Sequence, residues 1–314
     1  MHTVLDKGEL KRRNQVEHTN TEKNILSQYS HPFIVKLYYS FQNHEKLYMC
    51  LEYLHGGEMF QHLKEAKRFP ETLARFFLSE VILALEFLHS KDIIYRDIKP
   101  ENILVGADGH LKLTDFGLSK EGITSAGGKA MGTKTRTFCG TPDYLAPEII
   151  KGISHGKAVD WWGVGVLLFE MLVGHPPFTG TNHKELYQHI VSDEVLFPDF
   201  VQPAARSLLR GLLCKEPENR LGSKSTSEIK NHEFFGGLDW QMVYDKKIEP
   251  PFKPAAVDVD NHSVDQLLVD RGRRSSEMNL ILPQTECSNL GVSPNFTGFS
   301  YMNQSSFLST EQYY

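Results

Sequence analysis

The chain has 314 residues, of which 40% are hydrophobic, so it is long and apolar enough for one large domain or two smaller ones. Its net charge of -5 and pI near 6.3 exclude a basic field of the kind that recruits nucleic acid or an anionic membrane. We therefore expect no nucleic-acid partner and look for partners that recognise shape and local chemistry.

Neither the cysteines nor the apolar runs indicate a secreted or membrane protein. No CxxC pair occurs, so a zinc site and a disulfide framework are not predicted. We expect a reducing compartment, the cytoplasm, with the nucleus left open. Asp6–Arg13 is too charged for a signal core, and the apolar stretch Trp161–Val173 is short and interrupted by Glu170. That stretch predicts a buried helix without membrane insertion.

The first predicted elements are a helix and a hairpin. Val16–Tyr29 has a helical, polar-rich pattern that stops before His31-Pro32, where proline disfavours a helical predecessor. Phe33–Phe41 and Lys46–Tyr53 are rich in Val, Ile, Tyr and Phe, which favours two antiparallel strands.

Helices dominate the middle of the chain. Pro70 opens a long amphipathic helix whose apolar residues recur at three- and four-residue steps: Leu73, Phe76, Phe77, Val81, Leu85 and Leu88. Two short strands, Ile103–Val105 and Leu111–Leu113, flank a turn. A polar loop covers Glu121–Thr135, and helical patterns run from Ala158 to Leu213.

The composition changes after Phe235. Pro250–Pro254 predicts a rigid extended segment, and enrichment in Ser, Asn and Gln continues to the end. We therefore divide the chain into residues 1–54, 55–235 and 236–314, the last being a tail that is either docked or disordered.

The residues Tyr95–Asn102, followed by Asp115-Phe116-Gly117, carry the chemistry of phosphoryl transfer. That reaction needs metal ligands, a group that orients a hydroxyl, and cations against the developing charge. Asp97 would orient the substrate hydroxyl, and Lys99 would meet the transferred phosphoryl group. Asn102 and Asp115 would hold Mg²⁺ through oxygen ligands.

Each of these residues alone has an ordinary structural explanation. An isolated Arg-Asp is usually a surface ion pair, and a lone Asp-Phe-Gly is commonplace. Together with Ala146-Pro147-Glu148 and Asp160-Trp161-Trp162, in this order within about seventy residues, they favour catalysis.

These motifs resemble the protein kinases of the AGC group. Tyr95 in place of the usual histidine, Thr137–Pro142 and Pro250–Pro254 are similar to the ribosomal S-six kinases and protein kinase B, and Phe296–Tyr301 resembles their tail hydrophobic motif. The resemblance implies an α+β, two-lobed kinase-like fold, here with an incomplete N-lobe sheet and a mainly helical C-lobe. It also implies a serine/threonine protein kinase that uses ATP and Mg²⁺.

The resemblance further implies which residues surround the nucleotide. Glu22 would pair with the ATP-binding lysine, although from its pattern alone it is equally an exposed helix carboxylate. Glu52 and Leu54 would contact adenine through their backbone groups, with Leu51 at the rear of the pocket. Glu58 would lie at the edge of the same cofactor site.

Substrate recognition is implied in the same way. Glu58 and Glu101 would bind an arginine upstream of the phosphorylated residue by charge-assisted pairing, and Thr141 would lie at the substrate site. We therefore expect protein substrates with basic motifs, and a monomer as the default state.

Two phosphorylation sites are expected by resemblance. Thr137 would order the preceding loop by pairing its phosphate with Arg96, and an upstream activating kinase would be its partner. Ser300 would be the second site, with Phe296 and Phe299 docked beside the Glu22 helix. The alternatives are a solvated threonine and incidental tail aromatics. Ser276, with arginines three and five residues upstream, is a further candidate.

The chain departs from the kinase pattern near its start. No Gly-x-Gly-x-x-Gly precedes the predicted hairpin, and Thr3 stands where the ATP-binding lysine belongs. Lys7 and Lys11 lie beyond the end of that strand and are poor substitutes. We expect an amino-terminally truncated sequence in which three of five strands are absent or a stub, leaving a marginal two-stranded hairpin.

Two classes of function follow. The first is an active serine/threonine kinase, favoured by the intact Asp97, Lys99, Asn102 and Asp115. The second is a pseudokinase or scaffold that lacks the glycine-rich loop and the lysine. For the 314 residues alone we predict weak or absent transfer.

Overall fold

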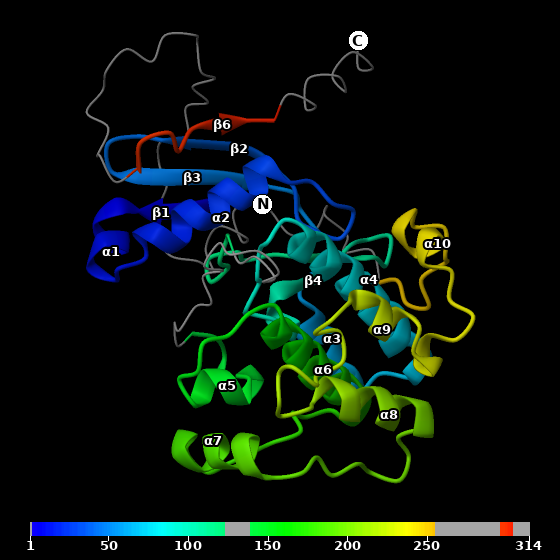
Figure 1. Cartoon of the computed structure of the whole chain (residues 1–314). Coiled ribbons are helices and arrows are strands. Elements are labelled where there is room, and N and C mark those ends of the chain that lie inside the picture. The colour runs from blue at the N-terminus through cyan, green and yellow to red at the C-terminus, as the bar shows by residue number, and fades with distance from the viewer. Residues whose placement is uncertain (1, 123–138, 255–295, 304–314) are drawn as a thin grey trace.

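A computed structural model describes residues 2–122, 139–254 and 296–303 of the chain. It has two lobes: a small lobe of one sheet with two helices, and a larger, mainly helical lobe below it (Figure 1). This arrangement confirms the predicted α+β kinase-like class.

The predicted hairpin forms the centre of the sheet. Strands β2 (Leu37–Gln42) and β3 (Lys46–Leu51) pair in antiparallel fashion. β2 begins later than the predicted Phe33, because the preceding residues cross to the other lobe: the backbone N–H of Val35 donates to the carbonyl of Leu113 at 2.9 Å. The apolar pattern before β2 thus belongs to the connection between the lobes.

Among the described residues the sheet has four strands, so the expectation of a two-stranded hairpin in this lobe was wrong. β1 (His2–Asp6) pairs along its whole length with β3, and β6 (Tyr301–Met302) pairs with β2, giving the order β1-β3-β2-β6. β1 is short, and β6 is 259 or more residues from its partner, so neither pairing leaves a local pattern. The added strands pair with both edges of the hairpin. They supply the additional strands that an isolated two-stranded ribbon needs for stability.

Two helices pack under this sheet. Helix α1 (Lys7–Arg12) begins at Asp6, whose side chain accepts a hydrogen bond from the Glu9 backbone N–H. Helix α2 (Val16–Gln28) has the predicted bounds to within one residue. Ile25 and Leu26 are its buried apolar residues, so the carboxyl-terminal half of α2 faces the core.

The helical lobe is built around α4 and α6. Helix α4 (Glu71–Ser90) follows Pro70 as predicted, and α6 (Ala158–Val173) is buried along nearly its whole length, as the apolar stretch within it predicted. Within the described residues, no helix is long and apolar enough to cross a membrane. The other long helices are α3 (Met59–Ala66), α7 (His183–Ser192) and α8 (Pro203–Leu212).

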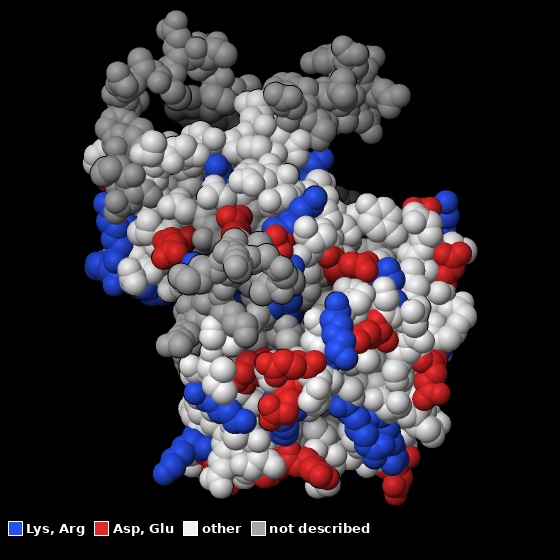
Figure 2. Space-filling model, viewed as in Figure 1, with Lys and Arg blue, Asp and Glu red and all other residues white. Residues whose placement is uncertain are grey.

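Short elements complete this lobe and position its loops. The predicted strand pair is present as β4 (Ile103–Val105) and β5 (Leu111–Leu113), and the short helices are α5 (Pro147–Ile150), α9 (Thr226–Lys230) and α10 (Trp240–Tyr244). On the face drawn in Figure 2, acidic and basic side chains alternate over the helical lobe.

The first part of the tail is docked on the helical lobe. Helix α10 packs against α4, and the proline-rich segment beyond it lies on the β4–β5 turn. Gly109 in that turn has φ +87°, and a Cβ there would lie 2.3 Å from the Phe252 carbonyl oxygen. Residues 255–295, including Ser276, lie outside the described part of the chain.

Candidate active site

Asp97, Lys99 and Asn102 meet on one loop between α4 and β4. The side chain of Asp97 is buried, and its Oδ2 lies 2.8 Å from Lys99 Nζ. Asn102 Nδ2 donates to the same oxygen at 2.6 Å and to the Asp97 carbonyl at 3.0 Å. A buried carboxylate held by one cation and one amide is fixed in orientation.

The loop is held from below by Asp160 at the start of α6. Its carboxylate accepts hydrogen bonds from the backbone N–H groups of Tyr95 and Arg96, at 2.9 and 2.7 Å, and contacts His89 Nε2 at 2.7 Å. Arg96 has φ +68°, a strained conformation for a non-glycine residue. The motif around Asp160 was noted in the sequence, but this anchoring role was not foreseen.

Asp115 faces the space between the lobes while Phe116 is buried behind it. Asp115 has φ +56° and is exposed, and its Oδ1 accepts a hydrogen bond from the Gly117 backbone N–H at 3.2 Å. The Phe116 ring is fully buried and lies edge-on to Tyr95, with ring centroids 5.2 Å apart. The inward aromatic ring therefore directs the neighbouring carboxylate outward.

The donors at this site fit a magnesium ion. Asp115 offers carboxylate oxygens, and the amide nitrogen of Asn102 is turned to Asp97, so that its amide oxygen points elsewhere. The described residues contain no group of three or more His, Cys, Asp or Glu side chains that could hold a metal. A set of two oxygen donors suits Mg²⁺, which binds chiefly through substrate phosphates and keeps several waters.

Glu22 lies on α2 above Asp115. It is half-buried, and burial, followed by the charge of Asp115, raises the pKa of its carboxyl to about 8; the Phe116 N–H bonded to the carboxylate offsets only part of this rise. Within the described residues, Glu22 forms no ion pair. Lys7 does not reach it, because its Nζ donates to Gln42 Oε1 at 2.7 Å and to the Asn43 carbonyl at 2.8 Å.

The predicted hinge connects the two lobes after β3. The Glu52 carboxylate accepts from the Lys36 N–H at 3.2 Å and pairs with Lys112 Nζ at 2.8 Å, so its side chain ties the hinge to β5. Its backbone N–H is bonded to the Lys36 carbonyl. Leu54 is half-exposed, and the rear residue Leu51 is buried.

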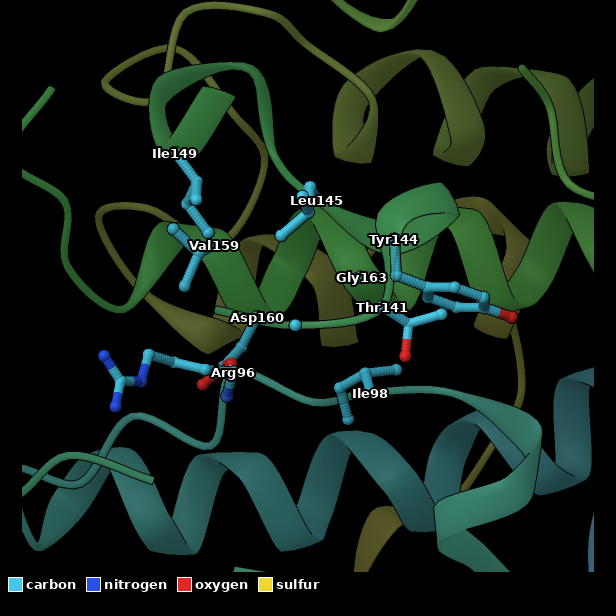
Figure 3. A pocket seen from close by; sticks show the side chains of 10 residues that line it. Arg96, Ile98, Thr141, Tyr144, Leu145, Ile149, Val159, Asp160 and Gly163 are labelled. Atoms are coloured by element: carbon cyan, nitrogen blue, oxygen red, sulfur yellow. The ribbon is translucent and has the colours of Figure 1, made fainter. Parts of the chain in front are cut away.

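The predicted substrate residues lie on different elements around Asp97. Thr141 Oγ1 approaches Asp97 Oδ1 at 3.5 Å, Glu101 is exposed on the turn that follows Lys99, and Glu58 precedes α3. In Figure 3, Thr141 and Tyr144 lie near Ile98, and Arg96 extends away from them beside Asp160.

Glu170 joins this group and was missed in the sequence. The Tyr144 hydroxyl donates to its carboxylate, and burial raises the pKa of Glu170, with Glu101 and Asp143 adding to the rise. Glu170 was noted only as the residue that interrupts an apolar run. A carboxylate inside a buried helix is the feature that identifies it, since such a group requires a partner.

Comparison with protein-family models identifies residues 3–235 as a protein kinase domain. The chain belongs to the protein kinase family. It is 44% identical to a RAC family serine/threonine-protein kinase homolog of Dictyostelium discoideum over 97% of its length, and 46% identical to the human RAC-beta serine/threonine-protein kinase over 80%. These relatives confirm the resemblance to AGC-group serine/threonine kinases.

The chain is shorter than these kinases. It spans 66% of the Dictyostelium RAC homolog, 51% of human RAC-beta, and 29% of the Dictyostelium protein kinase 3, to which it is 52% identical over 82% of its own length. The relatives therefore include segments without a counterpart in these 314 residues.

Arg96 has an unfilled donor beside the kinase active site. Its Nε donates to the Leu118 carbonyl at 2.6 Å, while the buried Nη1 finds no acceptor among the described residues. A buried guanidinium donor is costly unless it binds an acceptor, and a phosphate is one that suits it. Thr137, the predicted phosphorylation site, lies outside the described residues.

The tail returns to the small lobe of the kinase and docks there. Phe296 and Phe299 are both buried. Ser40 Oγ donates to the Phe299 carbonyl at 2.6 Å, and Gln42 Nε2 donates to the Phe296 carbonyl at 2.9 Å. Lys23 of α2 donates to the Gly298 carbonyl at 2.9 Å. The predicted docking beside the Glu22 helix is confirmed.

Two further side chains, Ser300 and Lys7, lie beside the docked tail. Ser300 is exposed between the buried Phe299 and the first residue of β6. Lys7 Nζ lies 5.6 Å from the centre of the Phe296 ring, a cation–π distance. The ammonium group of Lys7 therefore contacts both the β2–β3 hairpin, through its hydrogen bonds, and the Phe296 ring of the tail.

Proposed function

We propose that this kinase domain transfers the γ-phosphate of ATP to serine or threonine hydroxyls of proteins that carry an arginine upstream of the acceptor. The observation that carries the proposal is the buried Asp97 carboxylate, held by Lys99 at 2.8 Å and Asn102 at 2.6 Å. A non-catalytic module has no chemical need for this arrangement together with an exposed Asp115.

Each residue has a defined task in the reaction. Asp97 orients the substrate hydroxyl and accepts its proton as the new oxygen–phosphorus bond forms and the bond to the ADP oxygen breaks. Lys99 stabilises the negative charge on the transferred group. Asn102 and Asp115 would hold Mg²⁺, which supplies charge neutralisation when bound.

The arginine preference rests on the carboxylates near Asp97. Glu58 and Glu101 are the predicted partners, and Glu170 lies close enough to Glu101 for their charges to interact. A guanidinium entering this group would form charge-assisted hydrogen bonds and would lower the cost of burying Glu170.

Regulation by phosphorylation of Thr137 and Ser300 belongs to the same proposal, with an upstream kinase as partner. The unfilled Arg96 Nη1 supports an anion at the Thr137 position, and the exposure of Ser300 leaves it accessible to an enzyme. We further propose a monomer acting in the cytoplasm with access to the nucleus. Imaging of a fluorescent fusion confined to another compartment would contradict this location.

A second candidate is a pseudokinase or scaffold. The observation that favours it is Glu22, which has a pKa raised to about 8 and forms no ion pair within the described residues. Thr3 stands at the lysine position of the family pattern, and its strand partner Met49 is buried, so its side chain faces the inside of the lobe.

The test is phosphate transfer by the purified chain with Mg²⁺, labelled ATP and an arginine-containing peptide. We expect slow transfer that Asp97→Asn abolishes. Thr3→Lys would supply a cation that pairs with Glu22 and holds the phosphates, so we expect at least a tenfold increase. Transfer unchanged by Asp97→Asn would contradict the kinase proposal, and no transfer even from the Thr3→Lys variant would favour the scaffold.

A further inference from the structure

A hollow lies beside the proposed arginine site, between α3 and the end of α6. Its volume is about 260 Å³, and it has an apolar side, one acidic residue and two basic ones. The residues that line it are Phe60, Leu63, Lys64, Lys67, Glu170 and Gly174. A hollow of this size accommodates one side chain of a bound peptide.

The two lysines at the hollow are not neutralised. Lys64 and Lys67 are both exposed, and neither lies within ion-pair distance of a carboxylate in the part of the chain that the structure describes. Two ammonium groups three residues apart at the end of a helix repel each other. An anion bound between them would relieve this repulsion.

The position of Lys67 is fixed by the backbone. Lys67 ends α3 with φ +63°, and Gly174, with φ +98°, packs so closely that a Cβ there would lie 2.2 Å from the Lys67 carbonyl oxygen. The Phe69 N–H donates to the Met171 carbonyl at 2.7 Å. The end of α3 is thus fastened to the end of α6, which gives the hollow a defined shape.

Glu170 connects the hollow to the proposed arginine site. It lines the hollow, and its carboxylate also accepts the Tyr144 hydroxyl and interacts with Glu101. The Tyr144 hydroxyl holds the Glu170 carboxylate, and within the described residues Glu170 forms no ion pair with Lys64 or Lys67. One extended peptide is long enough to place an arginine on the Glu101 side and a neighbouring residue in the hollow.

We propose that this hollow is a subsite for an acidic residue of the substrate, located near the upstream arginine, with Lys64 and Lys67 binding its carboxylate. The proposal rests on the proposed function and specifies its substrate further: the preferred substrate carries an arginine and an acidic residue close together. Phe60 and Leu63 would contact the aliphatic part of that residue.

The test is binding of fluorescent peptides to the full chain, measured by anisotropy without ATP turnover. One peptide series carries the arginine and a glutamate scanned over the positions on either side of it, and a matched series carries alanine instead of the glutamate. We expect one glutamate position to bind about three- to tenfold more tightly, with the difference reduced at 0.5 M salt.

The variant Lys64→Gln/Lys67→Gly removes both charges with little risk to folding, since glutamine suits a helix and glycine suits a positive φ. It should bind glutamate and alanine peptides equally well. The variant Lys151→Gln, an exposed lysine on another element, is the control and should keep the preference.

The outcomes separate the two proposals. Binding that requires the arginine but is indifferent to glutamate at every position would overturn the subsite and leave the proposed function intact. Binding that does not depend on the arginine would overturn both. A glutamate preference that persists in the double variant would also exclude the hollow as its source.

Discussion

His31 illustrates how the fold controls a single side chain. It lies between α2 and β2, and its ring stacks on Phe87 with centroids 4.9 Å apart and lies edge-on to Tyr244 of the tail. Its Nδ1 accepts from the Phe33 N–H at 3.2 Å, which requires the neutral ring. Burial, together with the nearby Lys112 charge, lowers the pKa of His31 to about 4.

The free energy of unfolding should therefore decrease in acid because of His31. The unfolded chain binds a proton near pH 6.5 and the folded chain only near pH 4, so His31 contributes stability above pH 6.5 that is lost as the pH falls towards 4. We expect His31→Asn, which keeps an acceptor for Phe33, to reduce the loss between pH 7 and 4.5 by up to about 3 kcal/mol. Urea unfolding at several pH values measures this.

The matched control is His183→Asn, an exposed histidine at the start of α7. The free energy of unfolding of this variant should change with pH in the same way as that of the wild type. Parallel curves for the His31 variant as well would contradict the assigned pKa.

The catalytic residues were predictable because they are close in sequence. Asp97, Lys99 and Asn102 lie within six residues, so one motif contains the whole group. Glu170 could not be found in this way, because it reaches Glu101 only when α6 packs behind the loop. The raised pKa of Glu22 likewise depends on its burial in the fold and then on the charge of Asp115, a residue 93 positions later.

At the scale of elements, β6 and the tail residues before it hold the tail on the small lobe, and this role can be tested. Phe299 is 1% exposed and lies two residues before β6, the strand that extends the sheet beside β2; its carbonyl accepts from Ser40 Oγ of β2. Phe299→Ala should remove about 3 kcal/mol or more of local packing, so we expect the tail to detach without unfolding of the kinase domain.

Hydrogen exchange of the full chain measures this change. β2 and the end of α2 should lose protection in Phe299→Ala while α4 and α6 keep theirs. The control Met302→Ala, at a residue of β6 that is 41% exposed, should change little. Equal exchange in β2 for both variants would show that Phe299 does not hold the tail.

At the scale of the whole molecule, a buried ion pair fastens distant segments of the helical lobe. The terminal nitrogens Nη1 and Nη2 of Arg220 donate to Glu148 at 2.6 and 2.9 Å, and Nη1 also donates to the Ala158 carbonyl at 2.8 Å. The two residues are 72 positions apart and almost completely buried. The pair joins α5, α6 and the loop after α8.

Arg220→Ala should lower the free energy of unfolding by about 3–5 kcal/mol, because it leaves the Glu148 carboxylate buried and uncompensated. The control is Lys253→Ala, which breaks the exposed pair with Glu249 and should cost about 0–1 kcal/mol. Chemical unfolding followed by tryptophan fluorescence compares them. Similar losses for both variants would contradict the structural role assigned to Arg220.

The sequence by itself determined the local elements and the chemistry. Periodicity located α2, α4 and α6, turn residues located β4 and β5, and the string around Asp97 identified phosphoryl transfer. Only the tertiary structure decided the four-stranded sheet, the return of the tail to α2, the proximity of Glu101 to Glu170, and the contact of Lys7 with both the hairpin and Phe296. The reason is physical: helix and turn preferences arise between near neighbours, whereas strand pairing and the burial of charges depend on partners that only the complete fold brings together.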